Sequence, residues 1–163
     1  MKPRIRILLV VAVAAAGIAA VVLDLPPSLE ARAKPTRDDA GVAPALMAAY
    51  RAAARDAGSD GVRLRITSGR RTRAEQQRLL DEAIEKYGSR AEAARWVASP
   101  DTSAHVRGDA LDIGPTDGAL WLDEHGAAYG LCQVYANEIW HFELLTTPGG
   151  TCPALLPDGS SAR

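Results

Sequence analysis

Two short stretches hold the residue types from which a catalytic metal site can be built. The stretch SAHVRGDALDI, residues 103–113, places His105 and Asp112 seven positions apart, and NEIWHFE, residues 137–143, contributes His141. Two imidazoles and one carboxylate with an open fourth position describe a catalytic zinc site, because structural zinc sites are closed by four ligands rich in cysteine. The two stretches therefore supply candidate ligands for one zinc ion. The open position is where a water would be activated.

Both stretches must bend if their side chains are to meet. Gly108 allows a sharp turn in the first stretch. In a strict strand, residues three apart point to opposite faces, so Glu138 and His141 share a site only if the chain between them bends. We therefore expect Asn137 and Glu138 in a turn that enters a strand. Spacing alone leaves ordinary surface or core histidines as the alternative, because His-x6-Asp is no general zinc signature.

Three motifs, in this order along the chain, resemble those of the VanY-like D-alanyl-D-alanine carboxypeptidases. The sequence S-G-R-R-T, residues 68–72, is similar to the S-G-Y-R-S of that family, S-A-H-V-R-G-D-A-L-D to its S-x-H-x-x-G-x-A-x-D, and E-I-W-H to its E-x-W-H. The resemblance covers roughly residues 62–145. Arg70 stands in place of the family's aromatic residue and Thr72 in place of its serine. Neither departure removes Arg71. Both change side chains expected to line the substrate pocket, so they bear on which peptide the protein accepts.

The resemblance implies a role for each matched residue. The three candidate ligands, His105, Asp112 and His141, would hold one Zn²⁺ per chain, and Glu138 would be the general base. Arg71 would lie beside the scissile carbonyl. Ser103 would help to hold the terminal carboxylate of the substrate.

The implied substrate is a peptidoglycan stem peptide that ends in D-Ala-D-Ala. The implied fold is α+β, a small, mainly antiparallel sheet flanked by helices with the zinc site on the sheet, of the D,D-peptidase and hedgehog type. Related families on this scaffold act as L,D- or endo-acting peptidoglycan peptidases, and a cell-wall-binding module that does not cut is a further alternative. The presence of Glu138 argues against the module, because a pure binder has no need of a base.

General chemistry supports these roles. Zinc lowers the pKa of its bound water to about 7 and polarises a carbonyl, so that a nearby carboxylate can take the proton and pass it to the leaving amine. Arg71 offers a permanent charge and a planar fork of donors, which suit a developing oxyanion or a carboxylate.

Four residues near the motifs receive no chemical role. We predict that His125 is an exposed residue near a helix end, that Asp109 is a surface residue, and that Trp140 is structural and part of the core. Glu143 follows His141 by two positions and could face the site, but no role is assigned to it.

Hydrophobic periodicity and capping signals predict the elements that carry these motifs. T-R-A-E at 72–75 and S-R-A-E at 89–92 are capping boxes that open helices. Strict alternation from Val62 to Thr67 is typical of a half-buried strand. Helices followed by strands with helices between them suggest an α+β fold. The predicted elements are helices at 44–58, 72–88, 89–96 and near 118–130, and strands at 61–69, 110–114 and 139–145.

The N-terminus has the pattern of an export signal. Three basic residues precede an uncharged apolar run at 7–23, which is slightly long for a signal core and slightly short for a membrane span. Residues 1–25 are therefore predicted as either a cleaved signal peptide or a membrane anchor, and 26–41 as a linker. The order of charges places the zinc peptidase domain, 42–156, outside the cytoplasm, secreted or anchored to the outer face of the membrane. Residues 157–163 are predicted as a flexible tail.

Composition and the two cysteines fit this assignment. The chain of 163 residues is 47% apolar and 24% charged, as expected for one soluble domain with an appendage. Its 19 basic and 20 acidic residues create no strong field for nucleic acid, so no nucleic-acid partner is expected, and we expect a monomer. Cys132 and Cys152 suit an oxidising compartment as a disulfide, with two free buried thiols as the alternative.

Overall fold

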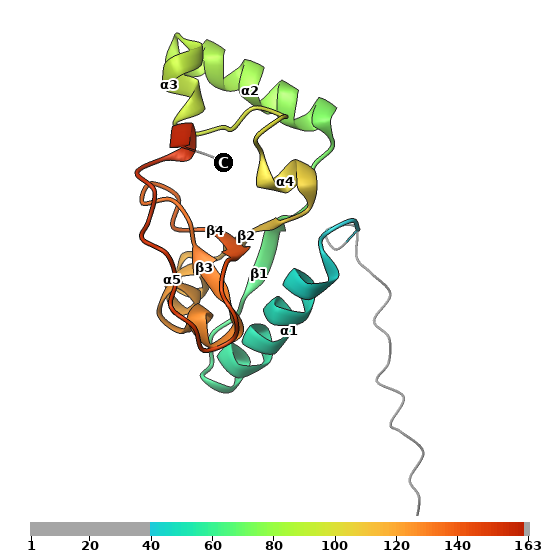
Figure 1. Cartoon of the computed structure of the whole chain (residues 1–163), viewed down its shortest axis with the longest axis vertical. Helices are drawn as coiled ribbons and strands as arrows, with labels where there is room; N and C mark the ends of the chain where they lie inside the picture. Colours follow the sequence, from blue (N-terminus) through green and yellow to red (C-terminus); the bar gives the residue numbers. More distant parts are fainter. Residues whose placement is uncertain (1–39, 162–163) are drawn as a thin grey trace, which may run out of the picture. The chain divides into compact units, whose positions relative to one another are not determined.

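A four-stranded antiparallel sheet lies at the centre of the residues that the computed structural model describes, 40–161 (Figure 1). Its strand order is β1-β2-β4-β3, so β2 and β4 are the inner pair. Asp112 on β2 lies opposite His141 on β4 and Ser68 on β1. The predicted α+β class with a mainly antiparallel sheet is confirmed. The strands are β1 (Arg65–Ser68), β2 (Ala110–Gly114), β3 (Leu131–Gln133) and β4 (His141–Leu144).

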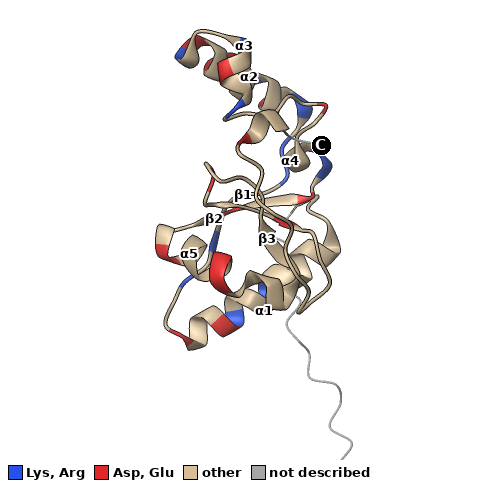
Figure 2. Cartoon of the chain, turned by 60° about the vertical axis from the view of Figure 1, so that its left-hand side comes forward, with Lys and Arg blue, Asp and Glu red and all other residues tan. Residues whose placement is uncertain are grey.

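The helices divide into two groups. In Figure 1, α1 and α5 lie at one end of the described domain and α2 and α3 at the other. Basic and acidic residues are interspersed along α1 and α2 (Figure 2), as in the ion pair of Arg78 with Glu82. The helices are α1 (Pro44–Ser59), α2 (Arg73–Tyr87), α3 (Arg90–Ala94), α4 (Ala104–Arg107) and α5 (Thr116–His125), with short 3-10 turns η2 (Gly126–Tyr129) and η3 (Gly159–Ser161).

The hydrophobic core occupies one face of the sheet. Leu111 and Ile113 of β2 and Phe142 of β4 are buried against apolar residues of α1 and α5. Side chains alternate between the faces of a strand, so the residues between them point the other way. Asp112 and His141 therefore lie on the opposite face of the sheet, away from the main core.

The capping signals in the sequence produced the helices they predicted. Thr72 and Glu75 form a complete capping box at the start of α2, which ends at Gly88 in the left-handed conformation. Ser89 accepts a hydrogen bond from the backbone N–H of Glu92 at the start of α3. These local bonds satisfy the otherwise unpaired amides of a helix N-terminus, so they are readable from sequence alone.

Other boundaries differ from the predictions. β1 starts at Arg65 rather than at residue 61, and α3 stops at Ala94, two residues before Trp96. The stretch around His105, where no helix was predicted, forms the single turn α4. It ends at Gly108, whose φ of +83° brings the chain so close to Gly41 that a Cβ there would lie 2.3 Å from the carbonyl oxygen. The bend predicted at this glycine is confirmed.

The C-terminal segment is ordered where a flexible tail was predicted from residue 157. Asp158 accepts a hydrogen bond from Arg95 at 3.0 Å, and Gly159 donates its N–H to the Arg95 carbonyl at 3.1 Å. Asp158 also accepts from the backbone N–H of Ser160. These bonds hold η3 beside α3, so the prediction is wrong for residues 157–161.

The segment predicted as an export signal or anchor, 1–25, lies outside the described residues, as does most of the predicted linker. Within residues 40–161, no helix is both long enough and apolar enough to span a bilayer.

A disulfide joins Cys132 of β3 to Cys152 and thereby ties the C-terminal segment to the sheet. The predicted pairing is confirmed. The bond closes a loop with a sequence separation of 20 residues. We expect replacement of both cysteines by serine to lower the free energy of unfolding by about 3 kcal/mol, because the unfolded chain regains the entropy of the open loop. Denaturant unfolding of both proteins without reductant measures the difference. Equal midpoints would show that the bond does not stabilise the domain.

Candidate metal centre and active site

Three candidate ligands converge from three different elements. His105 comes from α4, Asp112 from the middle of β2 and His141 from the first position of β4, and all three are buried. His105 Nε2 lies 3.2 Å from Asp112 Oδ1 and 3.2 Å from His141 Nδ1. His141 Nδ1 lies 3.4 Å from the same oxygen of Asp112. One ligand atom from each residue thus faces a common point, as expected of a group that could hold a metal ion.

The spacing of these atoms fits a zinc ion. Ligands about 2.0–2.1 Å from a tetrahedral zinc stand about 3.3–3.4 Å apart. The three observed separations are 3.2, 3.2 and 3.4 Å. Lone pairs that meet at this distance repel one another unless a cation or a proton lies between them. The donor set, two imidazoles and one carboxylate, is the set expected of a catalytic rather than a structural site.

Hydrogen bonds behind the histidines fix which nitrogen faces the centre. His105 Nδ1 donates to the Gly69 carbonyl at 2.8 Å, which leaves the lone pair of Nε2 free to bind a metal ion. His141 Nε2 donates to Glu143 Oε1 at 3.1 Å, which leaves Nδ1. Such outer partners set the tautomer and orientation of metal-binding imidazoles. Glu143 was assigned no role from the sequence, although its position two residues after His141 places both on one face of a strand.

Arg71 orients Asp112, the carboxylate among the three candidate ligands. Its Nη2 donates to Asp112 Oδ2 at 2.6 Å, so that Oδ1 is the oxygen that faces the centre. Its Nε donates to Ser68 at 2.9 Å and its Nη1 to the buried Gln76 at 3.2 Å. Three of five N–H donors are engaged in this way, and the side chain also lines the pocket. The sequence did not indicate the contact with Asp112, because it joins residues 41 positions apart.

Glu138 lies at the edge of the centre. The turn at Asn137 and the backbone bond from His141 N to the Glu138 carbonyl bend the chain, as predicted. The bend brings Glu138 Oε2 to 3.9 Å from His141 Nδ1. Burial raises the pKa of Glu138 to about 7, with the nearby His141 charge opposing and Asp112 adding to the rise. A carboxyl group with a pKa near neutrality is suited to both accepting and returning a proton.

The charges of the centre favour a cation. Burial by itself would raise the pKa of Asp112, but hydrogen bonds and charges from both histidines hold it well below its ordinary value. Burial would lower the pKa of His141, yet hydrogen bonds to Asp112 and Glu143 and the charges of Asp112 and Glu138 raise it to about 9. A site that draws a proton onto a buried imidazole is one in which carboxylates stabilise positive charge. A divalent ion bound at this centre would supply that charge.

A pocket of about 190 Å³ opens onto the centre and contains the remaining candidate residue. Ser103 is 3% exposed, and its hydroxyl makes no capping bond to α4, so it is not used to start that helix. Two exposed tryptophans, Trp96 and Trp140, also line the pocket. The prediction that Trp140 belongs to the core is wrong, because the turn before β4 leaves this side chain 41% exposed.

Two other residues lie apart from the centre. Asp109 is exposed and pairs with Arg107, as predicted for a surface residue. His125 ends α5, but it is half-buried rather than exposed, because its ring stacks on Trp121 with centroids 4.4 Å apart. Nδ1 of His125 also contacts the Trp121 carbonyl at 2.8 Å.

Comparisons with known proteins agree with the geometry. A family model described as VanY: D-alanyl-D-alanine carboxypeptidase matches residues 39–146. A D-alanyl-D-alanine carboxypeptidase of Enterococcus faecalis is 32% identical over 149 residues, which cover 76% of this chain and 54% of that protein. The chain thus spans about half the length of this curated relative.

Solved structures show the same fold. The vancomycin-resistance D,D-pentapeptidase VanY, as a variant in complex with Zn(II), is 27% identical with a TM-score of 0.62, over 68% of this chain and 76% of that one. VanYB in complex with D-alanine-D-alanine is 26% identical with a TM-score of 0.64, over 69% and 76%. The LD-carboxypeptidase LdcB is 28% identical with a TM-score of 0.55, over 63% and 65%. From the extent of the family match, this chain belongs to the VanY family of D-alanyl-D-alanine carboxypeptidases.

Proposed function

We propose that this protein is a zinc-dependent D,D-carboxypeptidase that removes the last residue of peptidoglycan stem peptides ending in D-Ala-D-Ala. The convergence of His105, Asp112 and His141 at the spacing of a tetrahedral zinc site, with Glu138 beside them, carries the proposal. The Zn(II) complex of VanY and the D-alanine-D-alanine complex of VanYB support it.

The metal would be held by His105, Asp112 and His141, and when bound it would acidify a water and polarise the scissile carbonyl. Glu138 takes a proton from the attacking water, whose oxygen forms the new bond to the carbonyl carbon. The C–N bond breaks, and Glu138 returns the proton to the nitrogen of the departing D-alanine. Arg71 keeps Asp112 oriented and presents its remaining N–H donors to the pocket. Ser103, which lines the same pocket, would bind the substrate's terminal carboxylate.

The raised pKa of Glu138 predicts an acid limb in the pH profile. A base must be deprotonated, so kcat/KM should fall about tenfold for each pH unit below the pKa and level off above it. The pKa is raised to about 7 by burial, and a nearby divalent cation favours the carboxylate, so the midpoint should lie at or below about 7. Rates measured between about pH 5 and 8 at constant zinc test this. A profile that rises toward acid would contradict the role of Glu138.

Glu143 should strengthen metal binding without contacting the metal. Its bond to His141 Nε2 fixes the ligating tautomer. Glu143→Ala is therefore expected to weaken zinc affinity about 10- to 100-fold, the usual effect of losing an outer partner. Competition with a chelator measures the affinity, and Glu124→Ala, an exposed carboxylate on α5, is the matched control. Equal affinities in the two variants would show that the hydrogen bond does not support the ligand.

L,D-carboxypeptidase activity is the second candidate. LdcB and the L,D-carboxypeptidase DacB of Streptococcus share this fold, with TM-scores of 0.55 and 0.53. A panel of peptides ending in D-Ala-D-Ala, or in an L-residue followed by D-Ala, separates the two activities. Release of D-alanine from the first group and not the second supports the D,D assignment, and the reverse result replaces it.

We also propose an extracytoplasmic location, because that is where the substrate occurs. The basic residues and apolar run at 1–23 and the disulfide between Cys132 and Cys152 support it. Fractionation of cells that produce the full chain tests the location, and recovery from the cytoplasm would contradict it.

A further inference from the structure

A second pocket lies beside the candidate metal centre, along the face of β4 that carries His141. Its volume is about 260 Å³, and Ala104 and Tyr135 line both pockets. Glu143, two residues after His141, lies on the same face of β4 and forms part of the second pocket. The second pocket therefore adjoins the place where the proposed substrate would bind.

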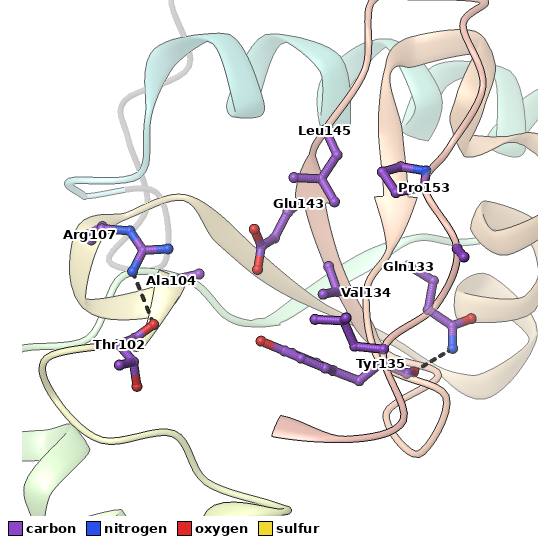
Figure 3. A pocket seen from close by; sticks show the side chains of 11 residues that line it. Thr102, Ala104, Arg107, Gln133, Val134, Tyr135, Glu143, Leu145 and Pro153 are labelled. Atoms are coloured by element: carbon purple, nitrogen blue, oxygen red, sulfur yellow. Dashed lines mark hydrogen bonds between the residues drawn. The ribbon is translucent and has the colours of Figure 1, made fainter. Parts of the chain in front are cut away.

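Opposite charges line this second pocket (Figure 3). Arg107 from the end of α4 and Glu143 from β4 face each other across it. Arg107 donates Nε to Asp109 and Nη1 to the Thr102 carbonyl, which hold its guanidinium in place and leave further N–H donors. Glu143 accepts one bond from His141 and keeps acceptor capacity on its second oxygen. Among the described residues, the ion pair of Arg107 is with Asp109, so the two charges stay separate.

The wall between the charges is apolar. Val134, Leu145, Pro153 and Leu156 contribute to it. Ligand pockets commonly combine an apolar wall with a few polar groups that fix orientation. The matching ligand has an aliphatic chain, an ammonium group for Glu143 and a carboxylate for the planar fork of Arg107.

We propose that this pocket binds a substrate side chain that ends in an ammonium and a carboxylate together, on the residue that adjoins the scissile dipeptide. The inference rests on the proposed peptidase function and names the feature that its substrate carries. A lysine side chain would satisfy Glu143 and leave Arg107 without an anion. Arg107 is thus a specificity-determining residue that selects the zwitterionic side chain.

Two peptides of otherwise equal sequence test this. Both end in D-Ala-D-Ala, and the preceding residue is lysine in one and 2,6-diaminoheptanedioic acid in the other. We expect the zinc-loaded protein to favour the second peptide about tenfold in kcat/KM, the effect of one hydrogen bond between charged groups. Arg107→Gln should abolish this preference, mainly through KM, and leave cutting of the lysine peptide unchanged. Arg78→Gln, an exposed arginine on α2, is the matched control and should keep the preference.

The outcomes separate this inference from the proposed function. Equal rates on both peptides, or an equal loss on both in Arg107→Gln, would overturn the inference. Calorimetric binding of both peptides to Glu138→Gln protein, with and without Arg107→Gln, provides a readout that needs no turnover. If neither peptide is cut but the zwitterionic one binds more tightly through Arg107, the proposed function fails and the pocket assignment stands. If both peptides are cut at equal rates, the proposed function stands and the pocket assignment fails.

Discussion

Replacing Glu138 by glutamine should lower kcat by about 10²- to 10⁴-fold, because general base catalysis contributes that much. The amide has nearly the shape of the carboxylate but cannot take a proton from the attacking water. We expect the effect on kcat rather than on KM, since the carboxylate acts mainly in the transition state. Steady-state kinetics on a D-Ala-D-Ala peptide measure both constants.

The same variant should keep its zinc and its fold. Glu138 Oε2 lies 3.9 Å from His141 Nδ1, farther away than the candidate ligand atoms lie from one another. Zinc content and the unfolding midpoint of Glu138→Gln should therefore match the wild type. Glu124→Gln, on the exposed side of α5, is the matched control and should keep full turnover. Wild-type turnover in Glu138→Gln would show that another group is the base.

Replacing His141 by alanine should remove the metal. This side chain supplies one of three candidate ligand atoms, and its loss leaves two. Because loss of an outer partner alone weakens affinity about 10- to 100-fold, loss of a ligand should cost more than about 100-fold. Zinc content after dialysis should fall from about one per chain to near zero, and turnover should fall with it.

His125→Ala is the matched control for this change. His125 stacks on Trp121 at the end of α5 and is not among the candidate ligands. The control should keep its zinc, although loss of the stacking contact lowers its stability slightly. Full zinc occupancy in His141→Ala would contradict the ligand assignment.

Local signals in the sequence predicted most of the fold. The capping residues Thr72 and Ser89 place helix starts through bonds that span only three residues, so a short window contains the whole signal. β3 was not predicted because its three residues are too short for an alternation to appear. The ordered segment at 157–161 was missed because its ion pair joins Asp158 to Arg95, 63 positions earlier.

The residues of the candidate site also divide into those that the sequence predicted and those that it did not. The positions of His105, Asp112, Glu138 and His141 come from motifs, which carry the spacing of each stretch. Some hydrogen-bond partners of these residues depend on contacts between distant stretches of the chain. Arg71 was expected at the scissile carbonyl, and its bond to Asp112 appears only when β1 and β2 pair. Glu143 could have been recognised, because alternation in a strand already places it on the face of His141.

Release of D-alanine from a peptide ending in D-Ala-D-Ala, with and without a chelator, tests the central claim most directly. The purified protein should release one D-alanine per peptide, lose this activity with the chelator and regain it when zinc is added. The Glu138→Gln protein should stay inactive after the same addition of zinc. Release that persists after the metal has been removed, or an absence of release from the zinc-loaded wild type, would contradict the assignment as a zinc D,D-carboxypeptidase.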